Sequence, residues 1–193
     1  GALAVPEGDQ IVPLVNRLQR CFELIVATQD WHPATHGSFA NNHARRQPGD
    51  LVNLNGRPQI LWPDHCVQNT AGADFVAALD QTRWSKVFQK GICPEIDSYS
   101  GFFDNGRRHA TGLGDYLREQ GATDVYVVGL AIDYCVKFTA LDARHLGFKT
   151  YVIEDGTRGV ELKPGDVAHA IKEMKEAGVA VVTSVSVAAR KRQ

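Results

Sequence analysis

The sequence lacks the features of membrane-spanning and nucleic-acid-binding proteins. No stretch approaches the roughly 18 consecutive apolar residues of a spanning helix. The 21 Lys and Arg nearly balance the 22 Asp and Glu, so the formal net charge is −1 and no strong field attracts nucleic acid or a membrane surface. The one basic run, Arg190-Lys191-Arg192, is typical of a frayed tail. We therefore expect neither a nucleic acid nor a membrane as partner.

Cysteine is sparse, and the pattern of the cysteines excludes two classes of small protein. Cys21, Cys66, Cys93 and Cys135 form no C-x-x-C pair, which argues against a zinc ribbon, and a chain of this length needs no disulfide framework. The segment 1–8 is too short for a signal peptide and lacks a basic flank. We expect a cytoplasmic protein with reduced thiols.

The composition is that of an ordinary globular domain. The chain has 193 residues, of which 44% are hydrophobic and 22% charged. This length can bury a sizeable core in one unit. We therefore predict a single domain over residues 1–193.

Short β-branched runs alternate with amphipathic stretches along the chain. The runs predict strands at 23–28, 85–90, 124–130, 149–154 and 179–183, and the amphipathic stretches predict helices at 9–21, 71–80, 113–120, 134–146 and 164–177. Polar loops are predicted at about 31–59 and at 91–108. This alternation predicts an α/β fold of three layers, with helices on both faces of a mostly parallel sheet.

Polar side chains cluster where three of the predicted strands end. Asp30 and His32 follow the first strand, Lys90 ends the second, and Asp133 and Cys135 follow the third. In open α/β sheets, ligands bind outside the carboxyl ends of the strands. These clusters are therefore the candidate functional site.

Cys135 is the candidate nucleophile of this site. It opens a predicted helix, whose dipole would lower the thiol pKa, although cysteine is also among the most frequently buried residues. Asp133 is expected to cap the same helix. Lys90 is either a solvated residue or a partner of the thiolate and, when deprotonated, a proton shuttle.

Asp30 and His32 are candidate metal ligands. Residues i and i+2 project from the same face of an extended chain, and His65 could supply a third ligand. Two histidines and one carboxylate suit Zn²⁺, Fe²⁺ or Mn²⁺. His36 and His43 lie in the same polar loop, and the sequence does not rank them against His65.

Aromatic residues flank these clusters, and a flat ring could stack on them, although aromatic side chains more often belong to a core. They are Trp31, Trp62, Tyr99, Phe102 and Phe103.

Taken together, these segments resemble nicotinamidases and pyrazinamidases of the isochorismatase-like cysteine hydrolase superfamily. The resemblance covers nearly the whole chain, in family order and spacing. It rests on GALAVPEGDQIVPLVNRL, TQDWHPATHGSFANNH, LWPDHCVQNT, VFQKGICPEIDSYSGFFDN, VVGLAIDYCVKFTALDA and EDGTRGV.

The resemblance implies a role for each candidate residue. Cys135 would be the nucleophile, and Lys90 would be a member of the catalytic triad. The backbone N–H groups of Ala131 and Cys135 would form the oxyanion hole. The resemblance further implies that Asp30, His32 and His65 ligate the metal, with His36 as a possible extra ligand. It also implies that Trp62 and Tyr99 line the pyridine pocket.

Two features of the segment 129–133 follow from the same resemblance. The family usually has a cis peptide here, which we place between Ala131 and Ile132. Ile132 itself departs from the threonine common in the family, and we expect this to change shape rather than remove a function.

The resemblance also places a strand ahead of Gly1. In the family a buried strand ending in D-x-Q-x-D-F-C precedes GGALAVPEG, and its first aspartate completes the triad. We expect this strand to lie inside the sheet. Its absence from the printed sequence leaves three alternatives: residues omitted from the chain as printed, a truncation, or an inactive relative.

The implied activity is the hydrolysis of nicotinamide to nicotinate and ammonia in NAD salvage, with pyrazinamide as a second substrate. The implied cofactor is one divalent metal, zinc before iron or manganese. Alternatives are a hydrolase of another small amide, such as a carbamoyl compound, and a metal-binding pseudoenzyme without the base. A homo-oligomer is compatible with the sequence.

Overall fold

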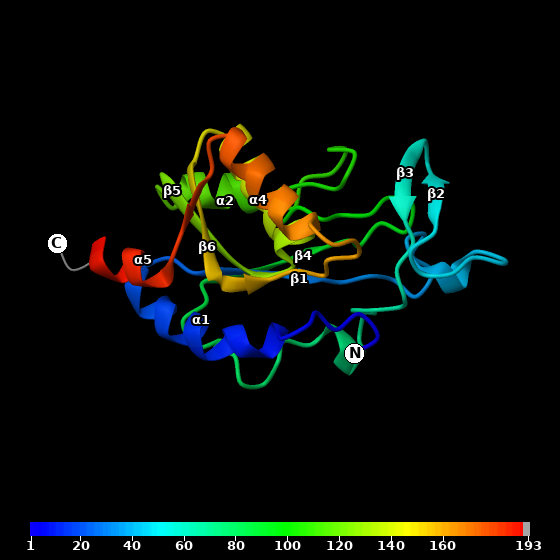
Figure 1. Ribbon diagram of the computed structural model, residues 1–193, viewed down its shortest axis with the longest axis horizontal. Coiled ribbons are helices and arrows are strands. Elements are labelled where there is room, and N and C mark those ends of the chain that lie inside the picture. The colour runs from blue at the N-terminus through cyan, green and yellow to red at the C-terminus, as the bar shows by residue number, and fades with distance from the viewer. Residues whose placement is uncertain (191–193) are drawn as a thin grey trace.

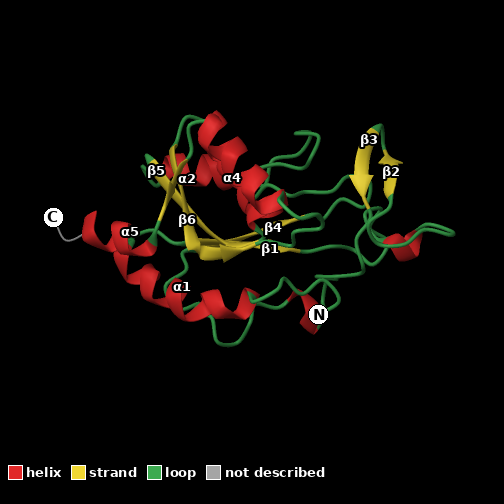
Figure 2. Ribbon diagram, viewed as in Figure 1, coloured by secondary structure: helices red, strands yellow, loops and turns green. Residues whose placement is uncertain are grey.

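The computed structural model describes residues 1–190, so Lys191 and Arg192 of the basic run lie outside the described residues. Parallel strands form two sheets (Figures 1 and 2). One sheet pairs β1 with β4, and the other has the order β5-β6-β7. These strands span Val26–Asp30, Lys86–Lys90, Asp124–Leu130, Lys149–Arg158 and Ala180–Val182. Among the described residues β1 and β5 are not paired with each other, so the predicted single sheet is divided.

Helices cover both faces of the strands. α1 and α5 lie along one side, and α2 and α4 lie along the other (Figure 1). The α-helices span Val12–Leu18 (α1), Leu113–Glu119 (α2), Lys137–His145 (α3), Asp166–Glu176 (α4) and Ser184–Arg190 (α5). Within residues 1–190, no helix is long and apolar enough to cross a membrane.

Two neighbouring residues of β6 show how the layers are held together. Val152 packs with α3 and α4, whereas Ile153 packs with Leu18 of α1 and Val187 of α5. Both β6 side chains are almost completely buried. Successive strand residues point to opposite faces, so one strand contributes to two cores. The predicted three-layer α/β architecture is confirmed.

Several predicted elements have different bounds in the structure. β1 ends at Asp30, two residues beyond the predicted strand. The predicted helix at 9–21 is α1 between two 3₁₀ turns, η1 (Gly8–Ile11) and η2 (Gln19–Cys21). The loop predicted at 31–59 contains a 3₁₀ turn, η3 (Ala40–Asn42), and an antiparallel hairpin of β2 (Leu51–Leu54) and β3 (Arg57–Ile60). α5 was not predicted.

The predicted helix at 71–80 is wrong. Only the 3₁₀ turn η4 (Ala71–Ala73) forms there. The carbonyl oxygens of Ala78 and Asp80 accept hydrogen bonds from the side chains of Asn16 and Gln19. These carbonyl groups therefore bond to the N-terminal helical segment rather than within a helix. The spacing of apolar residues in 71–80 does not reveal such contacts.

The long loop after β4 is organised around one carboxylate. Asp104 accepts hydrogen bonds from the backbone N–H groups of Gly106, Arg108 and His109, and from the His109 ring. The adjacent Asn105 donates its backbone N–H to the Asp97 carbonyl, and its side-chain oxygen accepts from the Tyr99 N–H. Asp104 therefore orders the turn 104–109, and Asn105 of this turn fixes the segment 97–99.

We predict that Asp104→Asn destabilises the protein by about 1–3 kcal/mol at neutral pH, because an amide cannot accept all these bonds. Burial alone raises the pKa of Asp104, but the backbone N–H groups and His109 outweigh it and lower that pKa below its ordinary value. The contribution is therefore complete above the unfolded-state pKa and is lost as pH falls through the lower folded-state value. Urea unfolding at neutral and acid pH measures the difference.

The matched control is Asp115→Asn, because that carboxylate on α2 is largely exposed. It should change the free energy of unfolding by less than about 0.5 kcal/mol at either pH. A loss in Asp104→Asn that is the same at both pH values would contradict the assigned role of the ionised carboxylate.

Candidate active site

The strand ends bring the predicted catalytic and metal-ligating residues together. Asp30 and Lys90 are the last residues of β1 and β4, and the parallel register places them side by side. Cys135 lies in a π-helical turn, η5 (Ile132–Val136), directly after β5. Lys90 Nζ is 3.5 Å from Cys135 Sγ. Three segments that are far apart in the sequence therefore meet at one edge of the sheets.

Lys90 is the centre of this arrangement. Its side chain is buried, its ammonium contacts Asp30 Oδ1, and it donates a hydrogen bond of 2.6 Å to the Ser98 carbonyl. Burial alone would lower the pKa of Lys90, but the charges of Asp30 and Cys135 raise it above its ordinary value. Lys90 therefore stays protonated at physiological pH. This argues against both the solvated alternative and the proton-shuttle alternative.

Cys135 differs from the sequence prediction in its pKa. Burial raises the pKa of the thiol to about 11, although the Lys90 ammonium opposes this rise. The predicted lowering by the helix dipole is therefore wrong for the described residues. A thiol with a raised pKa, beside the carboxylate of Asp30, needs a base to take its proton.

Asp133 is not the helix cap that the sequence predicts. Its carboxylate accepts hydrogen bonds from the backbone N–H groups of Val160 and Glu161, at 3.0 and 2.7 Å. It therefore ties the loop after β6 to the turn that carries Cys135.

The cis peptide lies between Leu130 and Ala131, so its predicted place between Ala131 and Ile132 is wrong by one bond.

Asp30, His32 and His65 form a group that could hold a metal ion. One ligand atom from each residue lies within 4.8 Å of the others. His32 Nδ1 is 2.8 Å from the Gly91 carbonyl, and His65 Nδ1 is 2.8 Å from the Pro63 carbonyl. Because a carbonyl only accepts, each Nδ1 carries the proton and each Nε2 presents a lone pair. The two imidazoles are therefore in the tautomer that a metal requires.

The charges in this group fit a cation. Burial alone raises the pKa of Asp30, but Lys90 and the neighbouring histidines lower it below its ordinary value, so the carboxylate is ionised. Burial lowers the pKa of His65, so its imidazole is neutral. One carboxylate oxygen and two imidazole nitrogens suit zinc, iron or manganese.

His36 and His43 occupy different places in the same loop. His36 is fully buried and, with His32 and Asp97, forms a second group whose ligand atoms lie within 4.8 Å of one another. Burial lowers the pKa of His36 to about 4. His43 bonds through Nε2 to the Gly37 carbonyl and belongs to neither group. The structure thereby separates histidines that the sequence could not rank.

Aromatic side chains stand beside Cys135. The rings of Trp62 and Tyr99 both pack edge-on against Tyr134, the residue before the nucleophile. Tyr99 also stacks on Phe138, and its hydroxyl accepts a hydrogen bond from Trp62. Sequence reasoning missed Tyr134 and Phe138, although the position of Tyr134 next to Cys135 was a usable signal.

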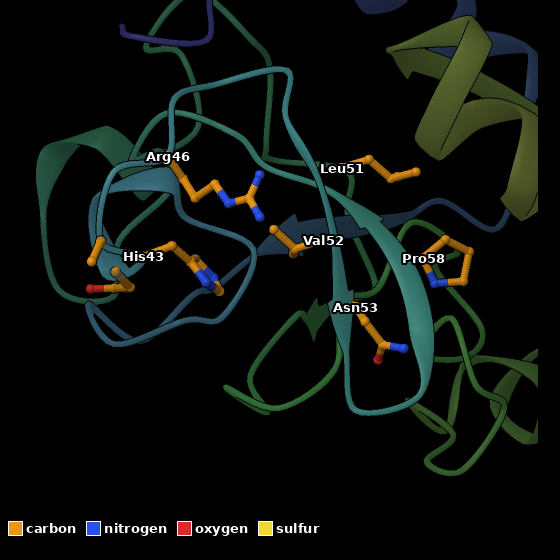
Figure 3. A pocket seen from close by; sticks show the side chains of 8 residues that line it. His43, Arg46, Leu51, Val52, Asn53 and Pro58 are labelled. Atoms are coloured by element: carbon orange, nitrogen blue, oxygen red, sulfur yellow. The ribbon is translucent and has the colours of Figure 1, made fainter.

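Phe102, another aromatic candidate, and one open pocket lie apart from this centre. Phe102 is buried in a core cluster with residues of β4 and α2, so it is a packing residue. An open pocket lies between the β2–β3 hairpin and the loop before it (Figure 3). None of its lining residues belongs to the metal-ligating group or contacts Cys135. They are Asn42, His43, Ala44, Arg46, Leu51, Val52, Asn53 and Pro58.

We predict that Gly91→Ala disturbs the His32 ligand. Gly91 has φ +67°, and a Cβ there would overlap the His32 ring. Displacing this ring should weaken zinc affinity by roughly 10–100-fold, as loss of a supporting contact does in other metal sites. Titration of the metal-free protein with zinc measures the effect.

Gly56→Ala is the matched control for backbone strain. Gly56 has φ +85°, but an added Cβ would meet no atom within 4 Å. Both variants carry the strain of a positive φ, and only Gly91→Ala should lose zinc affinity. Equal zinc affinity in the two variants would mean that His32 does not depend on Gly91.

Comparison with known proteins places this geometry in a family. The Isochorismatase domain model matches residues 2–186. The nicotinamidase of Escherichia coli K12 is 54% identical over 187 residues, which cover 95% of this chain and 87% of the relative. Among solved structures, a nicotinamidase and pyrazinamidase from Acinetobacter baumanii superposes with a TM-score of 0.94 at 45% identity, covering 97% of this chain and 90% of that one. The pyrazinamidase of Pyrococcus horikoshii in complex with zinc superposes with a TM-score of 0.75 at 41% identity, covering 95% and 90%.

Proposed function

We propose, from the premise that this chain belongs to the nicotinamidase/pyrazinamidase family of isochorismatase-like hydrolases, that it hydrolyses nicotinamide to nicotinate and ammonia. One observation carries the proposal beyond the family. The Lys90 ammonium contacts Cys135 Sγ and Asp30 together, so a nucleophile and a metal ligand share one buried charge. The same relatives support pyrazinamide as a second substrate, because a pyrazinamidase is among them. We assign the reaction to NAD salvage.

Cys135 is the nucleophile in this mechanism. Its sulfur attacks the amide carbon and forms a tetrahedral adduct. The Lys90 ammonium stabilises the thiolate that attacks. The backbone N–H groups of Ala131 and Cys135 donate to the oxyanion, and one such donor is typically worth about 2.7–4 kcal/mol.

The thiol proton must reach the leaving nitrogen. Lys90 is protonated and cannot take it. In the family pattern the base is the first aspartate of D-x-Q-x-D-F-C, a motif that the sequence from Gly1 onward does not contain. That aspartate takes the proton and passes it to ammonia as the C–N bond breaks. Water then hydrolyses the thioester to nicotinate and restores the thiol.

The substrate ring is held between the metal site and the aromatic residues. Asp30, His32 and His65 hold one divalent ion, which we take to be zinc because a homologous pyrazinamidase was crystallised in complex with it. When bound, such an ion would supply a Lewis acid beside the substrate pocket. Trp62, Tyr99 and Tyr134 supply apolar ring surfaces beside it.

The setting of the enzyme follows from the same proposal. The four cysteines are all free, which fits a reducing compartment. Five properties stay predictions. They are a cytoplasmic location, the formation of a homo-oligomer, the absence of a nucleic-acid partner, a single domain, and the position of the family's first strand.

We predict that Cys135→Ala abolishes ammonia release from nicotinamide and the nicotinoyl thioester, because Cys135 supplies the sulfur that hydrogen-bonds with Lys90. Mass spectrometry of the quenched full-length protein measures the thioester, and bound metal should be unchanged. Cys21→Ala is the control, since Cys21 lies in η2 beyond α1 and should keep the adduct. A nicotinoyl adduct that persists in Cys135→Ala would refute the assignment.

We predict that His65→Ala weakens zinc binding by roughly 100-fold or more, because it removes a ligand rather than a supporting group. His43→Ala is the matched control, as His43 lies in the preceding loop and its ring bonds to the Gly37 carbonyl, away from the metal-ligating group. Metal analysis after dialysis measures both variants. Full metal content in His65→Ala would move the third ligand elsewhere, with His36 as the first alternative.

A further inference from the structure

His36 is a buried histidine that the mechanism does not use. Its side chain is fully buried, and its Nε2 atom has no hydrogen-bond partner among the described residues. Leaving a buried polar atom without a hydrogen-bond partner destabilises a folded protein. Its ring lies 4.4 Å from that of His32, beside the metal ligands. We therefore expect a polar group to bind His36 Nε2 in the intact protein.

The hydrogen bonds at Nδ1 decide what Nε2 can do. The backbone N–H of Ser38 donates to His36 Nδ1 at 3.2 Å, and Ser38 Oγ is 2.7 Å from the same nitrogen. A backbone N–H only donates, so Nδ1 must present its lone pair. The neutral ring then carries its proton on Nε2. This is the opposite of His32 and His65, whose Nδ1 protons are held by carbonyl groups.

An acceptor faces the same interior point. Asp97 is buried, and ligand atoms of His32, His36 and Asp97 lie within 4.8 Å of one another. Asp97 Oδ1 accepts from the Ser98 N–H, and Oδ2 accepts from Gln59 Nε2. Each carboxylate oxygen can accept one bond more. The His36 ring and the Asp97 carboxylate are therefore close enough for one water molecule to bridge them, with a bond of about 2.8 Å to each.

We propose that His36 is a hydrogen-bond donor and not a metal ligand, and that with Asp97 it holds one water molecule beside the metal site. The water accepts from His36 Nε2–H and donates to Asp97. Its second lone pair is then directed away from both residues and is available to the ion held by His32. The identity of that ion rests on the proposed function, whereas the tautomer of His36 does not.

The tautomer can be read directly in the zinc-loaded protein labelled with ¹⁵N at histidine. Two-bond ¹⁵N–¹H correlations distinguish a protonated Nδ1 from a protonated Nε2. We expect protonated Nε2 at His36 and protonated Nδ1 at His32 and His65. A proton on Nδ1 of His36, with an Nε2 resonance that shifts on zinc addition, would overturn the proposal. This measurement uses the unchanged protein, so it does not depend on how any variant folds.

Two variants test the water-holding role by zinc affinity. His36→Gln keeps a donor at a similar reach and should bind zinc within about threefold of the parent. His36→Leu removes the donor and should bind roughly 10–100-fold more weakly, as loss of an outer contact does. Equal weakening in both variants identifies His36 as a direct ligand, and unchanged affinity in His36→Leu leaves no role for the water. Either result overturns the proposal.

His43→Gln is the matched control and should leave zinc affinity unchanged, because His43 belongs to neither group of ligand atoms. None of these readouts uses turnover. Failure of the proposed hydrolysis would appear as absent ammonia release in a protein that still binds zinc. Failure of the His36 proposal would appear in the spectra and the zinc affinities.

Discussion

The buried ammonium of Lys90 is the charge on which the rest of the site depends. Removing an ammonium from water is costly unless partners replace its hydration. Asp30, the Ser98 carbonyl and Cys135 together supply that replacement. Because Asp30 also belongs to the metal-ligating group, the nucleophile and the metal site are electrostatically coupled through Lys90. A change in charge at Cys135 therefore changes the electrostatic potential at the metal site, and the reverse also holds.

This cluster is held in place by main-chain groups. The Gly91 and Pro63 carbonyls fix the tautomers of His32 and His65, and the Ser38 N–H fixes that of His36. Asp104 and the neighbouring Asn105 hold the segment 97–99, whose Ser98 carbonyl binds Lys90. Main-chain groups cannot rotate away as side chains do, so the loops give a rigid polar environment. Rigid donors and acceptors are what a reaction with developing charge requires.

Much of the fold was predictable because local pattern and tertiary structure agree. The β-branched run at 124–130 is a strand with the predicted bounds, and its central side chains are half-buried. The segment 71–80 failed because Ala78 and Asp80 bond to side chains of the N-terminal helical segment. Cys135 and Lys90 were found from their positions at strand ends. Tyr134 and Asp133 were missed or misassigned because their partners, Trp62 and the loop after β6, are distant in the sequence.

The α/β class, the family resemblance and the types of residue at the strand ends can all be read from the sequence alone. Those properties depend on periodicity and on short motifs, which are local. The burial and protonation of Lys90, the raised pKa of Cys135 and the tautomer of each histidine depend instead on the folded arrangement. Burial and hydrogen-bond partners come from segments that meet only after folding. The chemistry of these side chains is therefore set by contacts that no local pattern contains.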